Sequence, residues 1–281
     1  MKTIKIAGVP EHFNLPWHLC IENGEFSTAG INLQWIDVPE GTGKMCQMLR
    51  EGETDIAVIL TEGIVKDITA GNNSKIVQVY VKSPLIWGIH VDTNSQYKTI
   101  NDLKGTKAAI SRYGSGSHLM SIVNAKNNNW DTQNLEFEIV NTIDGAVEAL
   151  TSQKADYFMW ERFMTKPLVD DGTFRRVGDC PTPWSCFVIA VRNEILETQP
   201  HIIEQILEII NTTTEEFKHI PSIDRTLASK YNQKLEDIQE WLSLTQWSQH
   251  QLDKKTLDKI QNQLYTLNII EKVAPYETIV K

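Results

Sequence analysis

The chain has 281 residues, of which 41% are hydrophobic, and it carries a formal net charge of −9. This composition allows a large buried core, and the length favours two lobes over a single one. The negative charge argues against nucleic acid as a partner, because no basic stripe is present to contact phosphates. No apolar run approaches the length of a membrane span.

The first elements alternate between strand and helix. Residues 4–9 predict a strand and not a cleaved leader, because no long apolar region or small-residue cleavage site follows the lysines. A polar and aromatic loop over residues 10–16 leads into a predicted helix over residues 17–29, which ends at Gly30. Residues 31–38 alternate between apolar and polar side chains, as a second strand does.

The same alternation continues along the chain. Residues 40–43 open a helix that ends at residues 51–52, residues 55–60 predict a buried third strand, and residues 61–63 open another short helix. Strands that alternate with helices predict an α/β fold with parallel-type sheets. In such folds the ligand loops follow the carboxyl ends of the strands.

The stretch 108–118 carries the most informative pattern. A short apolar run breaks into Ser and Gly residues and resumes at helical spacing from Leu119, which predicts a strand, a tight turn and a helix start. Free amides and the helix dipole would favour an anion there, with the hydroxyls of Ser111, Ser115 and Ser117 beside it. The alternative, that Ser115 or Ser117 only caps the helix, stays open. The spacing does not fit a dinucleotide fingerprint, a P-loop or a nucleophile elbow.

A weak internal repeat suggests two lobes of one architecture. Leu49 and Asp55 match Leu150 and Asp156 at an offset of about 101 positions, and residues 33–36 resemble 135–138.

The predicted lobe boundaries follow from this repeat and from two extended segments. We expect residues 1–85 with 190–281 to form the first lobe and residues 92–183 to form the second. The crossings are expected near residues 84–91 and 185–191. Amphipathic helices after Pro200 complete the first lobe.

Four cysteines, Cys20, Cys46, Cys180 and Cys186, show no metal-ligand spacing. We therefore expect reduced, mostly buried thiols, no metal site and no cofactor. The expected compartment is the cytoplasm, or the periplasm if a leader has been removed.

Several segments together resemble a known family. Residues 99–105, 111–118, 149–156 and 160–167 are similar to the type 2 periplasmic-binding-protein fold, in the branch of sulfonate, nitrate and taurine binders and fungal thiamine-pyrimidine proteins. The finer resemblance is to a small subgroup from fungi and bacteria whose members often lack an export signal. It implies two lobes joined by a hinge of two crossing strands, with one small ligand in the cleft between them.

The resemblance also implies a set of ligand contacts. In the first lobe these are Glu11, His12, Asn14, Gly41, Thr42, Gly43, Thr61 and Glu62, and in the second Ser111, Arg112, Tyr113, Gly114, Ser115, Gly116, Ser117, His118, Trp160 and Glu161. Trp184, just after a proline-rich break, either lines the cleft or supports the hinge. The turn would seat an anionic or strongly polar end, with Arg112 and His118 able to add positive charge. Two other interpretations of Arg112 stay open, a surface residue and an ion-pair partner of Glu161.

Three functions fit this sequence. The first is non-catalytic binding of a small polar or anionic metabolite; a transporter permease would be a partner only if the protein were exported. The second is an enzyme of pyrimidine or thiamine-precursor metabolism, and the third is an intracellular ligand sensor. No catalytic residue is assigned, because His12, His118 and Glu11 are more typical of hydrogen-bonding groups than of a catalytic base.

Overall fold

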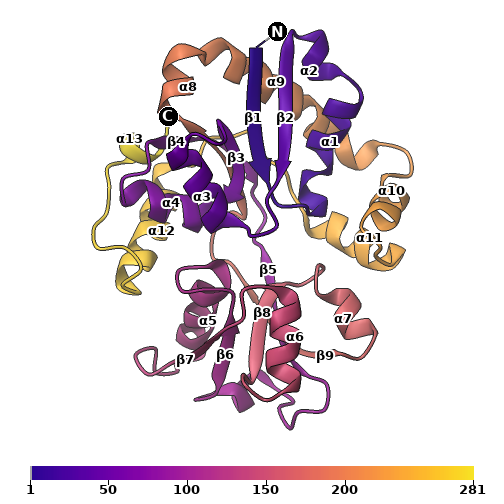
Figure 1. Ribbon diagram of the computed structural model, residues 1–281, viewed down its shortest axis with the longest axis vertical. Coiled ribbons are helices and arrows are strands. Elements are labelled where there is room, and N and C mark those ends of the chain that lie inside the picture. The colour runs from indigo at the N-terminus through magenta and orange to yellow at the C-terminus, as the bar shows by residue number, and fades with distance from the viewer. Residues whose placement is uncertain (1) are drawn as a thin grey trace. The chain divides into compact units, whose positions relative to one another are not determined.

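The computed structural model describes residues 2–281. The chain divides into two compact units, Met1–Ser83 with Trp184–Lys281, and Pro84–Pro183. We call them unit 1 and unit 2. The chain passes from one unit to the other at residues 83–84 and 183–184, and Figure 1 shows the elements of each unit coloured along the chain.

Unit 1 contains a five-stranded sheet with the order β2-β1-β3-β10-β4. Its strands are β1 (Lys2–Gly8), β2 (Ile31–Asp37), β3 (Ile56–Leu60), β4 (Ser74–Val81) and β10 (Phe187–Arg192). The first three strands run parallel, whereas β10 runs antiparallel to both β3 and β4. The central strand β3 is apolar along its whole length because helices cover both faces of the sheet.

The other elements of unit 1 are helices and two 3-10 turns. They are α1 (Leu15–Glu22), α2 (Glu25–Thr28), α3 (Thr42–Glu51), α4 (Thr61–Thr69), α8 (Asn193–Thr198), α9 (Pro200–Glu216), α10 (Ile223–Lys230), α11 (Leu235–Leu244), α12 (Lys254–Thr266) and α13 (Tyr276–Ile279), with 3-10 turns η1 (His12–Asn14) and η3 (Phe217–His219). Helix α1 packs against α9, and α3 packs against α4 (Figure 1). The single helix predicted over residues 17–29 is wrong, because Gly24 takes a φ of 72° and separates α1 from α2.

Unit 2 has a second sheet with the order β7-β6-β8-β5-β9. Its elements are β5 (Ile86–Asp92), η2 (Ile100–Leu103), β6 (Lys107–Ile110), α5 (Gly116–Asn127), β7 (Glu136–Ile139), α6 (Ile143–Thr151), β8 (Tyr157–Glu161), α7 (Lys166–Asp170) and β9 (Phe174–Pro181). The core beside α6 includes Ala149, Leu150 and Phe158.

The two sheets share one topology, and the predicted α/β class is confirmed. In each sheet three parallel strands are followed by an antiparallel one, β10 in unit 1 and β5 in unit 2. The predicted parallel-type sheets are present, and each also contains an antiparallel strand. In each sheet the antiparallel strand is the one that the chain enters directly from the other unit, β5 after β4 and β10 after β9.

The matched aspartates of the sequence repeat occupy equivalent corners. In unit 1, Asp55 accepts a hydrogen bond from the Lys5 amide at 2.9 Å and donates its own amide to the Lys5 carbonyl at 3.0 Å. In unit 2, Asp156 makes the same pair of bonds with Lys107, both at 2.8 Å.

All four cysteines are buried, as expected, and none of them forms a disulfide. Among residues 2–281, no helix is long and apolar enough to cross a membrane.

Candidate functional site

The loop after β1 buries an unusual histidine. The His12 side chain has no solvent exposure, and its ring stacks on the Trp241 indole with centroids 4.2 Å apart. Neither ring nitrogen has a hydrogen-bond partner. Burial lowers the pKa of His12 to about 3, so the ring is neutral at physiological pH. One unmet donor and one unmet acceptor therefore lie in this loop.

Two further polar residues flank His12. The Asn14 side-chain amide donates to the Val9 carbonyl at 2.8 Å, while the Asn14 Oδ1 atom has no partner. Burial raises the pKa of Glu11 to about 7, and the Tyr231 hydroxyl donates to the Glu11 carbonyl at 3.3 Å. The loop thus presents acceptors that the surrounding protein leaves unpaired.

A buried carboxyl group follows β3. Glu62 lies in the first turn of α4 and is 2% exposed. The Trp184 indole N–H donates to Glu62 Oε2 at 2.7 Å, whereas Oε1 has no partner. Burial raises the pKa of Glu62 to about 7. The neighbouring Thr61 hydroxyl donates to the Ser185 carbonyl at 2.7 Å, which ties the start of α4 to the start of β10.

The start of α3 lies beside the start of α4. Gly41 has a φ of 76° and precedes Thr42, the first residue of α3, with Gly43 exposed next to it. A Cβ added at Gly63 would lie 2.2 Å from the Thr42 methyl group, so the two helix starts are in close contact. The Phe13 ring contacts the Phe187 ring, with centroids 5.2 Å apart. This contact places the loop after β1 beside the start of β10.

The unit 1 residues thus gather at the carboxyl ends of β1 to β3. We call this group the first set: Glu11, His12, Asn14, Thr42, Glu62 and Trp184.

The 111–118 turn of unit 2 is built from mutual serine contacts. Ser115 is the N-cap of α5, and its hydroxyl accepts from the His118 amide at 3.3 Å. The Ser117 hydroxyl accepts from the Ser111 amide at 2.9 Å and lies 3.1 Å from the hydroxyls of both Ser111 and Ser115. The capping alternative therefore holds for Ser115 and is wrong for Ser117, because the helix begins at Gly116.

The His118 ring lies against the turn. Its Nδ1 atom accepts a hydrogen bond from the Gly114 amide at 3.1 Å, and the positive charge expected at His118 stays a prediction. Tyr113 is 62% exposed, and its ring contacts those of His118 and Phe137. Arg112 is half-buried and is the cation of this turn.

Backbone amides are the remaining donors of the turn. The first residues of a helix have no intrahelical acceptor for their N–H groups. In α5 these residues are Gly116 and Ser117. Gly114 has a φ of 78°, a conformation that allows the tight turn before the helix. We call residues 111–118 the turn.

Trp160 and Glu161 lie at the end of β8. The Trp160 ring stacks on Phe158 with centroids 5.5 Å apart and contacts Trp87, so it packs against the core of unit 2. Glu161 is 4% exposed, and its Oε2 atom accepts from the Met164 amide at 2.7 Å. This bond gives the Glu161 carboxylate the partner that its burial requires.

Comparison with known proteins finds chains with a similar sequence segment and a similar fold. Residues 87–180 match the family model described as Ca3427-like PBP. The Candida albicans CA3427 gene product, whose structure defines a family with the generic periplasmic-binding-protein fold, is 26% identical and gives a TM-score of 0.92, with 100% of this chain and 96% of that chain covered. The chain has the type 2 periplasmic-binding-protein fold.

Within this fold the chain is also similar to the SsuA proteins. The alkanesulfonate-binding protein SsuA from Xanthomonas axonopodis pv. citri, bound to MOPS, is 15% identical with a TM-score of 0.84, covering 99% of this chain and 97% of that one. The periplasmic aliphatic sulphonate-binding protein SsuA from Escherichia coli is 17% identical with a TM-score of 0.78, covering 99% and 92%. No curated protein matches the sequence.

Two contacts of the first set were missed by sequence reasoning. Trp241, on one of the amphipathic helices after Pro200, is 1% exposed and forms the face on which His12 stacks. Tyr231, at the end of α10, holds the carbonyl of Glu11. Helical periodicity predicts which face of a helix is buried, but it contains no information on which loop that face meets.

Proposed function

We propose that this chain is a non-catalytic binding protein for a small molecule with an anionic or strongly polar end, and that the first set and the turn both contribute to its binding. The observation that carries this proposal is the group of unpaired polar atoms in the first set: both His12 nitrogens, Asn14 Oδ1 and Glu62 Oε1. Each unpaired buried polar group costs about 1 to 3 kcal/mol. A bound ligand with matching donors and acceptors would remove that cost.

The anionic end is assigned to the turn. The amides of Gly116 and Ser117 and the positive end of the α5 dipole favour a negative group, and the half-buried Arg112 adds a full charge. The similarity to SsuA proteins supports this assignment, since the alkanesulfonates for which one of them is named are anions.

The first set would hold the polar remainder of the ligand. At neutral pH, His12 is uncharged and offers one donor and one acceptor, and Glu62 Oε1 and Asn14 Oδ1 are acceptors. The Trp184 indole fixes the orientation of the Glu62 carboxyl group through its 2.7 Å hydrogen bond. This combination suits a ligand that carries hydroxyl or amino groups.

The proposal includes a cytoplasmic location. The four cysteines support it, because all are buried, none forms a disulfide, and reducing compartments keep thiols reduced. A transporter permease becomes a partner only if the natural protein is exported.

Catalysis is the second candidate, and one observation favours it. Glu11 and Glu62 both have a pKa raised to about 7 by burial, which is where a general acid or base works well at neutral pH. The two functions differ in the fate of the ligand, because a binding protein returns it unchanged.

The test uses the ligand that accompanies the freshly purified chain, detected by native mass spectrometry. Gly116→Pro removes one amide donor at the first position of α5, where proline is well tolerated. The preceding Ser115, with φ −78° and ψ 170°, is compatible with a following proline. We expect the variant to lose at least nine tenths of the bound ligand.

Lys254→Pro is the matched control, since it places proline at the first position of α12, outside the first set and the turn. It should keep the ligand. Full ligand retention by Gly116→Pro would exclude the turn as the anion site, and recovery of a converted product after incubation would favour the enzyme.

A further inference from the structure

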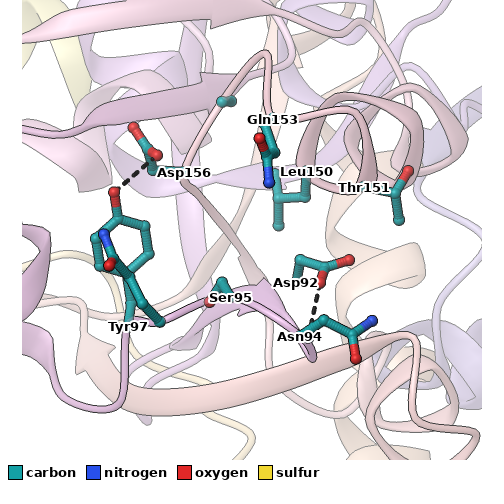
Figure 2. Close-up of a pocket in the computed structure, with 10 residues that line it drawn as sticks. Asp92, Asn94, Ser95, Tyr97, Leu150, Thr151, Gln153 and Asp156 are labelled. Carbon is teal, nitrogen blue, oxygen red and sulfur yellow. Dashed lines mark hydrogen bonds between the residues drawn. The ribbon is translucent and has the colours of Figure 1, made fainter.

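Unit 2 contains a second polar cavity, far from the turn. It has a volume of about 730 Å³ and is lined by Asp92, Asn94, Ser95, Gln96, Tyr97, Leu150, Thr151, Gln153, Ala155 and Asp156 (Figure 2). Asp156 directly precedes β8, whereas the turn follows the carboxyl end of the parallel strand β6. The cavity therefore lies at the opposite end of the sheet from the turn. Its volume is in the range of small-molecule sites.

Two carboxylates face this space. Asp156 Oδ1 accepts from the Tyr97 hydroxyl at 3.0 Å and Oδ2 accepts from the Lys107 amide at 2.8 Å. Asp92 Oδ1 accepts from the Asn94 amide at 2.7 Å (Figure 2). All of these donors are neutral, and the ten lining residues include no lysine, arginine or histidine. The nearby Arg175 directs its terminal nitrogens to the carbonyls of Thr93, Ser95 and Tyr97.

Unit 1 shows what occupies the equivalent position there. Asp55, the counterpart of Asp156, has its Oδ1 atom 3.7 Å from Arg192 Nη1. The Arg192 guanidinium also bonds to Glu194 at 2.6 Å and lies over Gly52, where an added Cβ would be 3.2 Å from it. In unit 1 a guanidinium group from the chain itself therefore occupies this corner and offsets the charge of Asp55.

The strand register identifies the counterpart of Arg192. Arg192 ends β10 and pairs with Ser74, the first residue of β4, while its amide bonds to the Asp55 carbonyl. Asp92 ends β5, the equivalent strand, and pairs with Phe174, the first residue of β9. An aspartate thus stands in unit 2 where unit 1 has the arginine.

The two units also differ at a second position of this corner. Gly52 has a φ of 72°, and its counterpart Gln153 has a φ of 59°, a region that favours glycine. The Gln153 side chain lines the cavity at this position (Figure 2). Its amide oxygen provides an acceptor for an N–H donor.

We propose that this cavity binds a free small molecule that carries a guanidinium group, which would occupy the position that Arg192 fills in unit 1. Asp92 and Asp156 would accept its N–H groups in charge-assisted hydrogen bonds, and Gln153 would accept a further one. A planar guanidinium suits this arrangement because its five donors can reach more than one carboxylate.

The test titrates L-arginine and L-citrulline into the full-length chain, followed by amide chemical shifts in nuclear magnetic resonance spectra. Citrulline has nearly the same shape but replaces the guanidinium by a neutral urea group. We expect arginine to bind at least tenfold more tightly than citrulline, with the largest shifts at residues 92–97 and 153–156. Equal binding of the two, or no binding of arginine at 20 mM, would overturn the proposal.

Variants locate the site. Asp92→Arg supplies the guanidinium from the chain itself, as unit 1 does, and should abolish arginine binding; Asp92→Asn should weaken it at least fivefold. Asp144→Asn, an exposed aspartate of the same unit outside the cavity, should change it less than twofold. Unaltered binding by both Asp92 variants would overturn the proposal.

Two further experiments test whether the cavity is distinct from the turn and whether it takes a free molecule or a protein segment. Gly116→Pro should leave arginine binding unchanged, because the turn lies at the other end of the sheet. Binding of a blocked Gly-Arg-Gly peptide in place of free arginine would assign the guanidinium to a protein segment and contradict the small-molecule proposal.

Discussion

The two units differ in how the loop after an equivalent strand satisfies its buried polar groups. Each places a loop at the carboxyl end of equivalent strands, β1 in unit 1 and β6 in unit 2. In unit 1 the loop buries His12 and Asn14 with unpaired polar atoms. In unit 2 the serines of the turn satisfy one another, and Ser115 caps the following helix.

This difference indicates that the first set lowers the stability of the empty protein and that the turn raises it. Unpaired buried groups lower the free energy of unfolding unless something binds to them, whereas a capped turn raises it. We therefore expect substitutions in the first set to stabilise the empty protein and substitutions in the turn to destabilise it. The following predictions test that contrast, in order of decreasing effect.

Glu62→Gln should stabilise the protein by about 3 kcal/mol at pH 8. The folded-state pKa of Glu62 is raised from 4.5 to about 7 by burial, so the folded protein holds an extra proton between these values. The free energy of unfolding of the parent therefore falls as the pH rises from about 4.5 to 7. Glutamine keeps an acceptor for the Trp184 indole and removes this loss.

Urea unfolding at pH 5 and pH 8 measures the effect, which should nearly vanish at pH 5. Glu271→Gln, an exposed residue of the same unit, serves as the control and should show a small, pH-independent difference. Equal stabilities of Glu62→Gln and the parent at pH 8 would show that the carboxylate is not penalised by its burial.

His12→Phe should raise the free energy of unfolding by about 2 kcal/mol. Phenylalanine keeps the stack on Trp241 and removes two unpaired ring nitrogens. Chemical denaturation at pH 7 provides the measurement. A destabilised variant would mean that the His12 nitrogens are paired in solution, and the contrast between the units would fail.

Ser115→Ala should lower the free energy of unfolding by about 1 kcal/mol, because it removes the N-cap of α5. Thr142→Ala provides the comparison, since Thr142 caps α6 in the same unit through the Gly145 amide. Thermal unfolding of both variants should show similar losses. No loss for Ser115→Ala would remove the stabilising role assigned to the turn.

Gln153→Gly should stabilise the chain by about 0.5 kcal/mol, the smallest effect, because glycine adopts positive φ without a steric penalty but loses more backbone entropy on folding. The reverse change in unit 1, Gly52→Gln, should destabilise it, since a side chain there meets Arg192. Urea unfolding measures the change in the free energy of unfolding for each variant. Changes of opposite sign would support the equivalence of positions 52 and 153, and changes of the same sign would contradict it.

The sequence predicted the larger part of the fold. The repeat matched Asp55 with Asp156, and the structure gives both the same hydrogen bonds. The break between α1 and α2 was missed because a glycine within an apolar period is tolerated in many helices, and only its φ of 72° separates them.

The candidate site was less accessible to sequence reasoning. The residue types around Glu62 and the turn were named, and their role in ligand binding stays a prediction. The hydrogen bond from the Gly114 amide to His118 and the lack of partners at the His12 nitrogens both depend on which atoms the packing brings near each ring. Local sequence patterns do not encode such tertiary contacts.

The most direct test of the account is a calorimetric titration of the recovered ligand into the ligand-free parent, Glu62→Gln and Gly116→Pro. Losing one charge-assisted hydrogen bond removes about 1.5 to 3 kcal/mol, so the account predicts that each variant binds about ten to a hundredfold more weakly than the parent. Binding within twofold of the parent by either correctly folded variant would contradict the proposal that the first set and the turn each contribute to ligand binding.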